Sequence, residues 1–150
     1  MSAKLIAFEG LDGSGKETQT TLLREKLRAR GINVASISFP MYGKPSAALV
    51  EDYLHGGFGE RAEDVNAYAA SSFFAMDRFV SYLKEWRKIY ENVDVLIADR
   101  YVTSNAIHQC SKLPRSQWKE FTDWLLHYEH DLLGLPRPDL VFLFAARYRY

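Results

Sequence analysis

A glycine-rich segment near the N-terminus constrains this chain more than any other feature. The apolar residues 5–8 lead directly into the pattern Gly-x-x-x-x-Gly-Lys at positions 10–16, and helical spacing of apolar residues follows. In such a loop, backbone N–H groups surround phosphate oxygens and the lysine adds a positive charge. The helix N-terminus favours the same anion. We therefore expect a strand, a phosphate-binding loop and a helix. The alternative is an ordinary Gly/Ser turn that ends in lysine.

The residue after Lys16 departs from the usual pattern. Phosphate loops of this kind carry Ser or Thr there, whose hydroxyl binds Mg²⁺, whereas this chain has Glu17 followed by Thr18. A carboxylate is also a hard oxygen donor. Three interpretations of Glu17 stay open: it ligates the metal directly, it holds one of the metal's waters, or it stabilises the helix N-terminus through the dipole.

Length and composition limit the class of protein. The chain has 150 residues, a formal net charge of zero and one cysteine, Cys110. We expect one domain, no broad positive surface for nucleic acid or an anionic membrane, and a reducing compartment. The N-terminus has no secretory signal pattern, which predicts a cytoplasmic protein. The longest apolar run, 140–146, is too short to span a membrane and predicts a buried strand.

Periodicity along the chain predicts an α/β fold. Strands are expected from residue 4 to the glycine loop, at 32–38, at 94–98 and from residue 140. Helices are expected at 16–30, 60–91, 103–110 and 114–133, of which 60–91 could be interrupted, and residues 43–59 are expected to form a short helix followed by a flexible turn. Strand–helix–strand order favours parallel strands joined by right-handed crossovers.

Four motifs in order resemble the thymidylate kinase family between residue 4 and about residue 143. They are Phe-Glu-Gly-Leu-Asp-Gly-Ser-Gly-Lys at 8–16, Phe-Pro-Met-Tyr at 39–42, Phe-Ala-Met-Asp-Arg at 74–78 and Asp-Arg-Tyr-Val-Thr-Ser-Asn at 99–105. The resemblance implies the P-loop nucleoside monophosphate kinase fold, ATP as phosphoryl donor, dTMP as acceptor, Mg²⁺ as cofactor and a possible homodimer. The expected ATP-binding residues are Gly10, Gly13, Ser14, Gly15, Lys16, Glu17 and Thr18.

Two residues four positions apart suit a nucleobase. Phe74 and Arg78 lie on one helix face, where a ring can stack on the base and a guanidinium can donate to a carbonyl on its edge. The spacing alone fits a core Phe beside a surface Arg equally well. By resemblance, the base is thymine.

The segment after the third expected strand suits a phosphate. Arg100 follows that strand, where its fork can grip a phosphate with two hydrogen bonds. The resemblance implies that Arg100 holds the dTMP phosphate, that Asp99 helps organise Mg²⁺ and that Asp12 contacts the deoxyribose 3′-hydroxyl. The alternatives are an Asp99–Arg100 structural ion pair and a turn role for Asp12.

The resemblance also implies dTMP contacts from three segments: Phe39 and Tyr42 near the acceptor phosphate, Ser104 and Asn105 near the base, and His108 near the sugar. Relatives often carry a tyrosine at the position of His108, so a structural histidine is an equal alternative. The expected catalytic residues are Lys16, Arg100 and Asp99. The acceptor oxygen is already anionic, so positioning and charge stabilisation suffice without a general base.

The end of the chain departs from the family. After Leu143 the sequence resembles neither the arginine-bearing lid nor the fifth strand of relatives. We therefore expect one P-loop kinase domain, 1–150, without lid and last strand, that binds nucleotide poorly and turns over slowly. The alternatives are another P-loop nucleoside or nucleotide kinase and a non-catalytic nucleotide-binding fragment.

Overall fold

A computed structural model describes residues 2–145 of the chain. These residues form two compact units, which are described separately. The first contains 2–38, 85–101 and 137–145, and the second contains 39–84 and 102–136. Most of the segment expected to depart from the family, 144–150, lies outside the described residues. No helix within 2–145 is long and apolar enough to cross a bilayer.

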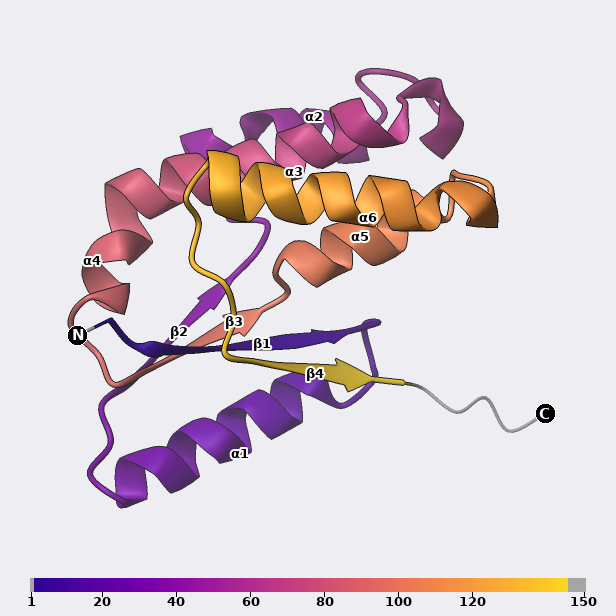
Figure 1. Ribbon diagram of the computed structural model, residues 1–150. Helices are drawn as coiled ribbons and strands as arrows, with labels where there is room; N and C mark the ends of the chain where they lie inside the picture. The colour runs from indigo at the N-terminus through magenta and orange to yellow at the C-terminus, as the bar shows by residue number, and fades with distance from the viewer. Residues whose placement is uncertain (1, 146–150) are drawn as a thin grey trace. The chain divides into compact units, whose positions relative to one another are not determined.

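The first unit is built on a four-stranded parallel sheet. Its strands are β1 (Lys4–Gly10), β2 (Val34–Ser38), β3 (Val95–Asp99) and β4 (Leu140–Phe144), in the spatial order β2-β3-β1-β4. Helix α1 (Lys16–Ala29) lies along one face of the sheet, as Figure 1 shows. The short helix α4 (Arg87–Tyr90) precedes β3. The expected α/β fold with parallel strands is confirmed.

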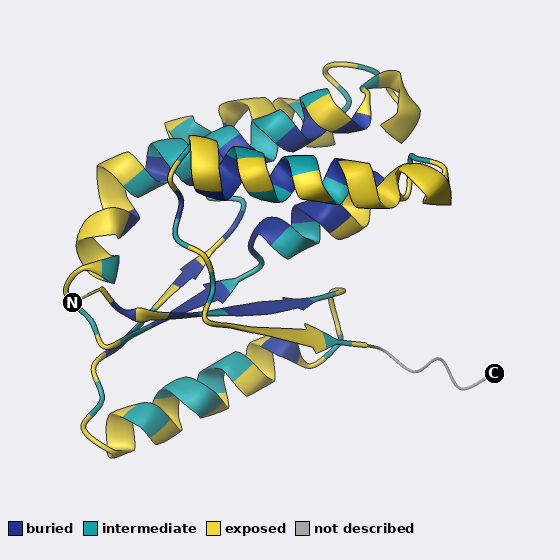
Figure 2. Ribbon diagram, in the orientation of Figure 1, coloured by how far each residue is buried: buried dark blue, intermediate teal, exposed yellow. Residues whose placement is uncertain are grey.

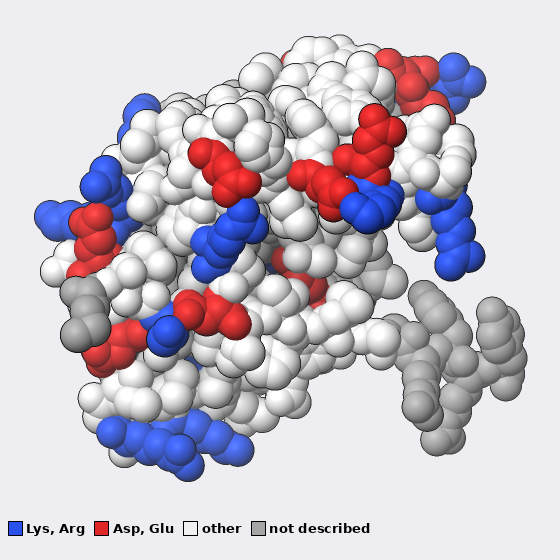
Figure 3. All heavy atoms as spheres, in the orientation of Figure 1, with Lys and Arg blue, Asp and Glu red and all other residues white. Residues whose placement is uncertain are grey.

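The face of the sheet toward α1 has its own apolar core. Phe8, Val34 and Ile97 are buried there, and Leu23 and Leu27 of α1 pack against them. Leu23 and Leu27 are four positions apart, so they lie on one side of the helix, while Lys and Arg side chains of α1 gather at the lower edge in Figure 3. The amphipathic spacing of this segment thus fixes which side of α1 meets the sheet.

Strand β4 differs from the buried strand that its apolar sequence predicts. Its side chains from Leu140 to Leu143 are between 43% and 63% exposed, and the strand is yellow in Figure 2, whereas β1 and β3 are largely dark blue. β4 is an edge strand that pairs with β1 on one side only, but this position alone does not expose it, because Val34 and Ile37 are buried in the other edge strand, β2. Successive side chains of a strand point to opposite faces, and all four from Leu140 to Leu143 are exposed, so neither face of β4 is well covered within the described residues. Hydrophobicity therefore predicts this strand correctly and its burial wrongly.

The second unit is helical. Its helices are α2 (Ala48–Leu54), α3 (Ala67–Ser81), α5 (Val102–Cys110) and α6 (Trp118–Leu126), with 3₁₀ turns at Pro45–Ala47, Ala62–Asp64 and Arg115–Gln117. Helix α3 contacts both α2 and α5, and α5 contacts α6. Phe121 and Leu125 of α6 are buried, whereas Trp118, the first residue of the helix, is 41% exposed. Cys110 is a buried free thiol.

The expected long helix 60–91 is interrupted at two points. Helix α3 begins only at Ala67, where the Asn66 side chain accepts a hydrogen bond from the Ala69 N–H at 2.9 Å and caps the helix. A π-helical turn, Tyr82–Trp86, then separates α3 from α4. A second π-helical turn, His127–Leu132, follows α6. The interruption allowed for by the sequence is therefore real, and its two causes are a cap and a widened turn.

Candidate functional site

The phosphate loop has the expected geometry. β1 ends at Gly10 and α1 begins at Lys16, and Gly13 and Gly15 adopt left-handed φ values of 78° and 88°. Gly10 has a second reason to be glycine: a Cβ atom there would lie 2.9 Å from the carbonyl oxygen of Phe144 in the paired strand β4. The loop thus depends on glycine both for its turn and for the approach of the neighbouring strand.

Lys16 is positioned by the first turn of α1 and by the end of β3. Its side chain is only 8% exposed, and its Nζ forms an ion pair with Asp99 Oδ1. The Thr20 hydroxyl donates to the Lys16 carbonyl oxygen at 2.8 Å, within the first turn of the helix. Lys16, predicted to bind phosphate, and Asp99, predicted to help bind the metal ion, are therefore in direct contact although they lie 83 positions apart.

Arg100 and Asp12 form a second contact in the same unit. Arg100 Nη2 donates to Asp12 Oδ1 at 2.7 Å, and the Asp12 side chain is 97% exposed. An exposed pair of this kind contributes about 0–1 kcal/mol. Arg100 also has φ = 65°, a left-handed conformation that costs a residue with a Cβ roughly 1–2 kcal/mol. It is the only non-glycine residue with positive φ among residues 2–145.

A polar hollow of about 260 Å³ lies beside the Lys16–Asp99 pair. It is lined by Glu17, Thr20, Thr21, Arg24, Ser36, Ile37, Ser38 and Asp99. The lining therefore includes two carboxylates and four hydroxyl-bearing side chains, whose oxygen atoms suit a hard cation, together with the guanidinium of Arg24, which suits phosphate oxygens. Within the described part of the chain, no three His, Cys, Asp or Glu side chains gather closely enough to hold a metal ion alone.

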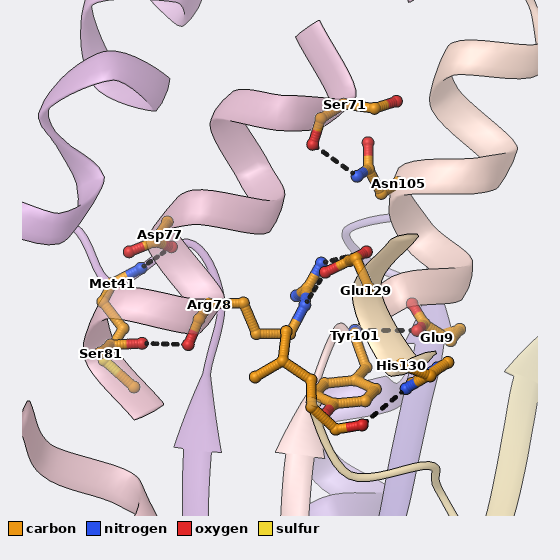
Figure 4. Close-up of polar contacts among 11 residues, drawn as sticks. Glu9, Met41, Ser71, Asp77, Arg78, Ser81, Tyr101, Asn105, Glu129 and His130 are labelled. Atoms are coloured by element: carbon orange, nitrogen blue, oxygen red, sulfur yellow. Dashed lines mark hydrogen bonds and ion pairs between the residues drawn. The ribbon is translucent and has the colours of Figure 1, made fainter. Parts of the chain in front are cut away.

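In the second unit, Arg78 is buried and bound to Glu129. Arg78 Nε donates to Glu129 Oε1 at 2.7 Å and Nη2 to Oε2 at 3.4 Å, with the two side chains 3% and 0% exposed (Figure 4). The Arg78 guanidinium also lies 5.0 Å from the centre of the Phe39 ring. Sequence reasoning missed Glu129, since it lies 51 residues away on the π-helical turn after α6 and belongs to no motif.

Asn105 and Phe74 also lie in the second unit. Asn105 Nδ2 donates to the Ser71 carbonyl oxygen at 3.1 Å, while its buried Oδ1 has no hydrogen-bond partner (Figure 4). The ring of Phe74 is partly exposed and meets the Tyr53 ring edge-on, with centroids 6.1 Å apart. The buried unpaired oxygen of Asn105 is an unused acceptor, which costs free energy unless a ligand or water donates to it.

The loop that carries Phe39 and Tyr42 is tied to α3 by a residue that the sequence did not single out. Asp77, 1% exposed, accepts from the Met41 N–H at 3.0 Å and from the Ser46 hydroxyl at 2.8 Å. Phe39 is buried, whereas Tyr42 is 62% exposed. Asp77 belongs to the motif at 74–78, but no role was predicted for it, because its partners lie 36 and 31 residues away.

The predicted site residues therefore fall into two sets. Asp12, Lys16, Asp99 and Arg100 lie in the first unit and form two ion pairs, Lys16–Asp99 and Asp12–Arg100, with Glu17 and Thr18 on the first turn of α1. The second unit contains Phe39, Tyr42, Phe74, Arg78, Ser104, Asn105 and His108. Ser104 is partly exposed and His108 is exposed on α5.

Comparison with known proteins adds an independent finding. A family model described as "Thymidylate kinase" matches residues 8–149, which extends past residue 143, where the resemblance identified from the sequence ends. A thymidylate kinase of Mycobacterium tuberculosis (strain ATCC 25618 / H37Rv) is 39% identical over 143 residues, 95% of this chain and 65% of the relative. A Caenorhabditis elegans thymidylate kinase is 30% identical, over 93% of this chain and 62% of the relative.

Solved structures agree with the sequence relatives. A thymidylate kinase from Candida albicans superposes with a TM-score of 0.67 at 27% identity, covering 96% of this chain and 63% of that one. One from Ehrlichia chaffeensis gives 0.66 at 26% identity, covering 96% and 75%. The chain spans about two thirds of the length of the curated relatives that it matches.

Proposed function

Because this chain belongs to the thymidylate kinase family, we propose that it transfers the γ-phosphoryl group of ATP to dTMP, giving ADP and dTDP. The observation that carries the proposal is the pairing of Lys16, at the start of the phosphate-loop helix, with Asp99, next to Arg100 in the chain. One end of the sheet then presents a cation for the donor phosphates and a guanidinium fork for the acceptor phosphate.

The donor site uses backbone groups and one lysine. The N–H groups of the glycine loop and of the first turn of α1 are donors for the β- and γ-phosphates of ATP, and Lys16 supplies the charge. Lys16 is held by a carboxylate before ATP arrives. Its ammonium group can therefore exchange that carboxylate for phosphate oxygens without being carried to the site by a large movement.

The acceptor phosphate fits Arg100. Its present partner, Asp12, is almost fully exposed, so a dianionic phosphate can replace that carboxylate at small cost. Asp12 is then available for the sugar hydroxyl that the resemblance implies. Arg100 and Lys16 stabilise charge on the transferred group, and the anionic acceptor oxygen needs no base.

The second unit offers groups that complement a thymine edge. Thymine presents a carbonyl oxygen, O4, next to an N–H donor, N3. Arg78 is a donor for the carbonyl, and the unpaired Oδ1 of Asn105 is an acceptor for the N–H. Phe74 contributes a ring for stacking. Cytosine has an amino group in place of O4 and no hydrogen on N3. Its amino group would face the donor Arg78, and its N3 would face the acceptor oxygen of Asn105, so this arrangement favours dTMP over dCMP.

The residues of the polar hollow fit Mg²⁺. Asp99 and Glu17 are the side chains that would hold the ion or its waters, and the other ligands would be water and phosphate oxygens, as is usual for Mg²⁺. When bound, the ion neutralises charge on the phosphoryl oxygens. A homodimer stays a prediction from the family resemblance, and a cytoplasmic location stays a prediction from the N-terminal sequence.

A substrate panel tests the proposal. ADP release, or calorimetric affinity if turnover is slow, is compared for dTMP, dCMP and thymidine with ATP and Mg²⁺ present. We expect dTMP to give the highest kcat/KM or affinity, Lys16→Met to reduce ATP-dependent turnover at least 100-fold, and the exposed matched control Lys119→Met to change it less than twofold. A preference for thymidine or dCMP would identify another kinase, and tight ATP binding without phosphoryl transfer would identify a non-catalytic nucleotide-binding protein.

A further inference from the structure

The backbone at Arg100 is held in its left-handed conformation by two consecutive residues of β1. The Arg100 N–H donates to the Phe8 carbonyl oxygen at 2.8 Å, and the Tyr101 N–H donates to Glu9 Oε1 at 2.8 Å. The first bond continues the β1–β3 ladder beyond its last registered pair, Phe8 with Asp99. In the second bond, the acceptor is the Glu9 side chain instead of a backbone carbonyl of β1. The chain therefore leaves the sheet at Tyr101, whose N–H is bound by the Glu9 carboxylate (Figure 4).

Both partners of the second bond are buried. Glu9 is 0% exposed and Tyr101 is 1% exposed, so water cannot take the place of the carboxylate without entering the interior. The rings of Trp86 and Tyr101, 6.3 Å apart between centroids, enclose the turn further. A left-handed non-glycine residue persists where its surroundings fix it, and such strain is characteristic of functional sites.

We infer that Glu9 is a positioning residue for the acceptor phosphate, acting through the backbone of Tyr101 to hold Arg100 in the conformation that points its guanidinium toward Asp12. The inference rests on the proposed function only in taking the phosphate bound by Arg100 to be that of dTMP. It assigns Glu9 no proton transfer and no metal. A buried carboxylate with a fixed N–H donor serves as an anchor for the turn, and Gln can replace it because an amide oxygen accepts the same hydrogen bond.

A double-mutant cycle isolates this role. For each variant, calorimetry gives the dissociation constants of dTMP and of thymidine, and their ratio, thymidine over dTMP, measures what the phosphate adds to binding. We expect Glu9→Leu to lower this ratio at least tenfold, Glu9→Asp to lower it less, and Glu9→Gln to keep it within about threefold of wild type. Thymidine affinity itself should change less than twofold in all three. In an Arg100→Ala background, Glu9→Leu should have no further effect on the ratio.

Each outcome decides the question. An unchanged ratio in Glu9→Leu, an equal loss of thymidine and dTMP affinity, or a further loss in the Arg100→Ala background would overturn the inference. So would a Glu9→Gln variant as impaired as Glu9→Leu, since that indicates a role for the charge itself. If Glu9→Leu does not fold, as judged by its thermal transition, Glu9→Asp and Glu9→Gln carry the same comparison. If the wild-type chain binds neither dTMP nor thymidine, or binds both equally, the proposed function fails before Glu9 is tested.

Discussion

Two arginines of this protein hold their carboxylate partners in opposite ways. Arg100, in the first unit, meets an Asp12 side chain that is 97% exposed. Arg78, in the second unit, meets a Glu129 side chain that is 0% exposed. An exposed pair is weak and screened by salt, so a ligand anion can displace its carboxylate. A buried pair is fixed in place, because separating its charges leaves one of them unpaired in the interior.

The difference corresponds to the ligand groups proposed for each arginine. A phosphate carries charge enough to compete with Asp12, so Arg100 needs a partner that it can release. A neutral base edge cannot displace a carboxylate from an arginine. Arg78 must therefore be oriented before the base binds, and its ion pair with Glu129 fixes the direction of the remaining guanidinium N–H groups. The arginine proposed for the charged phosphate therefore has a carboxylate partner that can be displaced, and the arginine proposed for the neutral base has one that cannot.

The largest expected effect is on the buried pair. Glu129→Ala leaves the Arg78 guanidinium without its carboxylate in the interior, and we expect a loss of about 3–5 kcal/mol in the free energy of unfolding. Urea denaturation followed by circular dichroism measures it. The matched control is Glu91→Ala, which removes the exposed partner of Arg87 at 2.9 Å and should cost less than about 1 kcal/mol. Equal losses in the two variants would remove the contrast between buried and exposed pairs.

The next effect is on ligand affinity. Arg100→Ala should weaken dTMP binding by about 10- to 100-fold, since a hydrogen bond to a charged group contributes about 1.5–3 kcal/mol. Thymidine affinity, measured in the same calorimetric series, should stay within twofold. A comparable loss for thymidine would show that Arg100 does not act on the phosphate.

The strained backbone of Arg100 gives a smaller, separate effect. Arg100→Gly and Arg100→Ala both remove the guanidinium, but only glycine adopts φ = 65° without strain. We therefore expect the glycine variant to be more stable than the alanine variant by about 1 kcal/mol. Thermal and urea unfolding of the two variants side by side provide the measurement. An alanine variant at least as stable as the glycine variant would argue against strain at this residue.

The smallest expected effect concerns another exposed pair, Lys4 with Asp139, at 2.9 Å. The hydrogen bond from Lys4 and, to a smaller extent, that from the Leu5 N–H lower the pKa of the Asp139 carboxyl below its ordinary value of 3.8. Its stabilising contribution is thus complete above that value and is lost as pH falls through the lowered pKa. Asp139→Asn should reduce stability modestly at pH 7, and the difference from wild type should shrink progressively as pH falls below 3.8, in unfolding experiments at pH 7 and at a series of lower pH values. A constant difference between variant and wild type at all pH values would contradict this assignment.

The sequence predicts the first unit's site better than the second unit's contacts. The glycine loop, Lys16 and the Asp99–Arg100 dipeptide lie in short motifs whose geometry follows from local spacing, and each motif residue is found at a strand end or helix start. Glu9, Asp77 and Glu129 were not identified, because their contacts join residues 92, 36 and 51 positions apart. The exposure of β4 was missed for a related reason: whether other elements cover the faces of a strand depends on contacts between residues far apart in the sequence.

The π-helical turn His127–Leu132 makes the length of that segment matter as much as its composition. A π turn accommodates one residue more than an α turn, and here it contains two adjacent buried side chains, Glu129 and His130. Removing a single residue would let the helix continue in ordinary α geometry, which advances about 100° per residue, and would swing the carboxylate away from Arg78. A one-residue difference in spacing between relatives at this point is therefore a structural change, even where every remaining amino acid is identical.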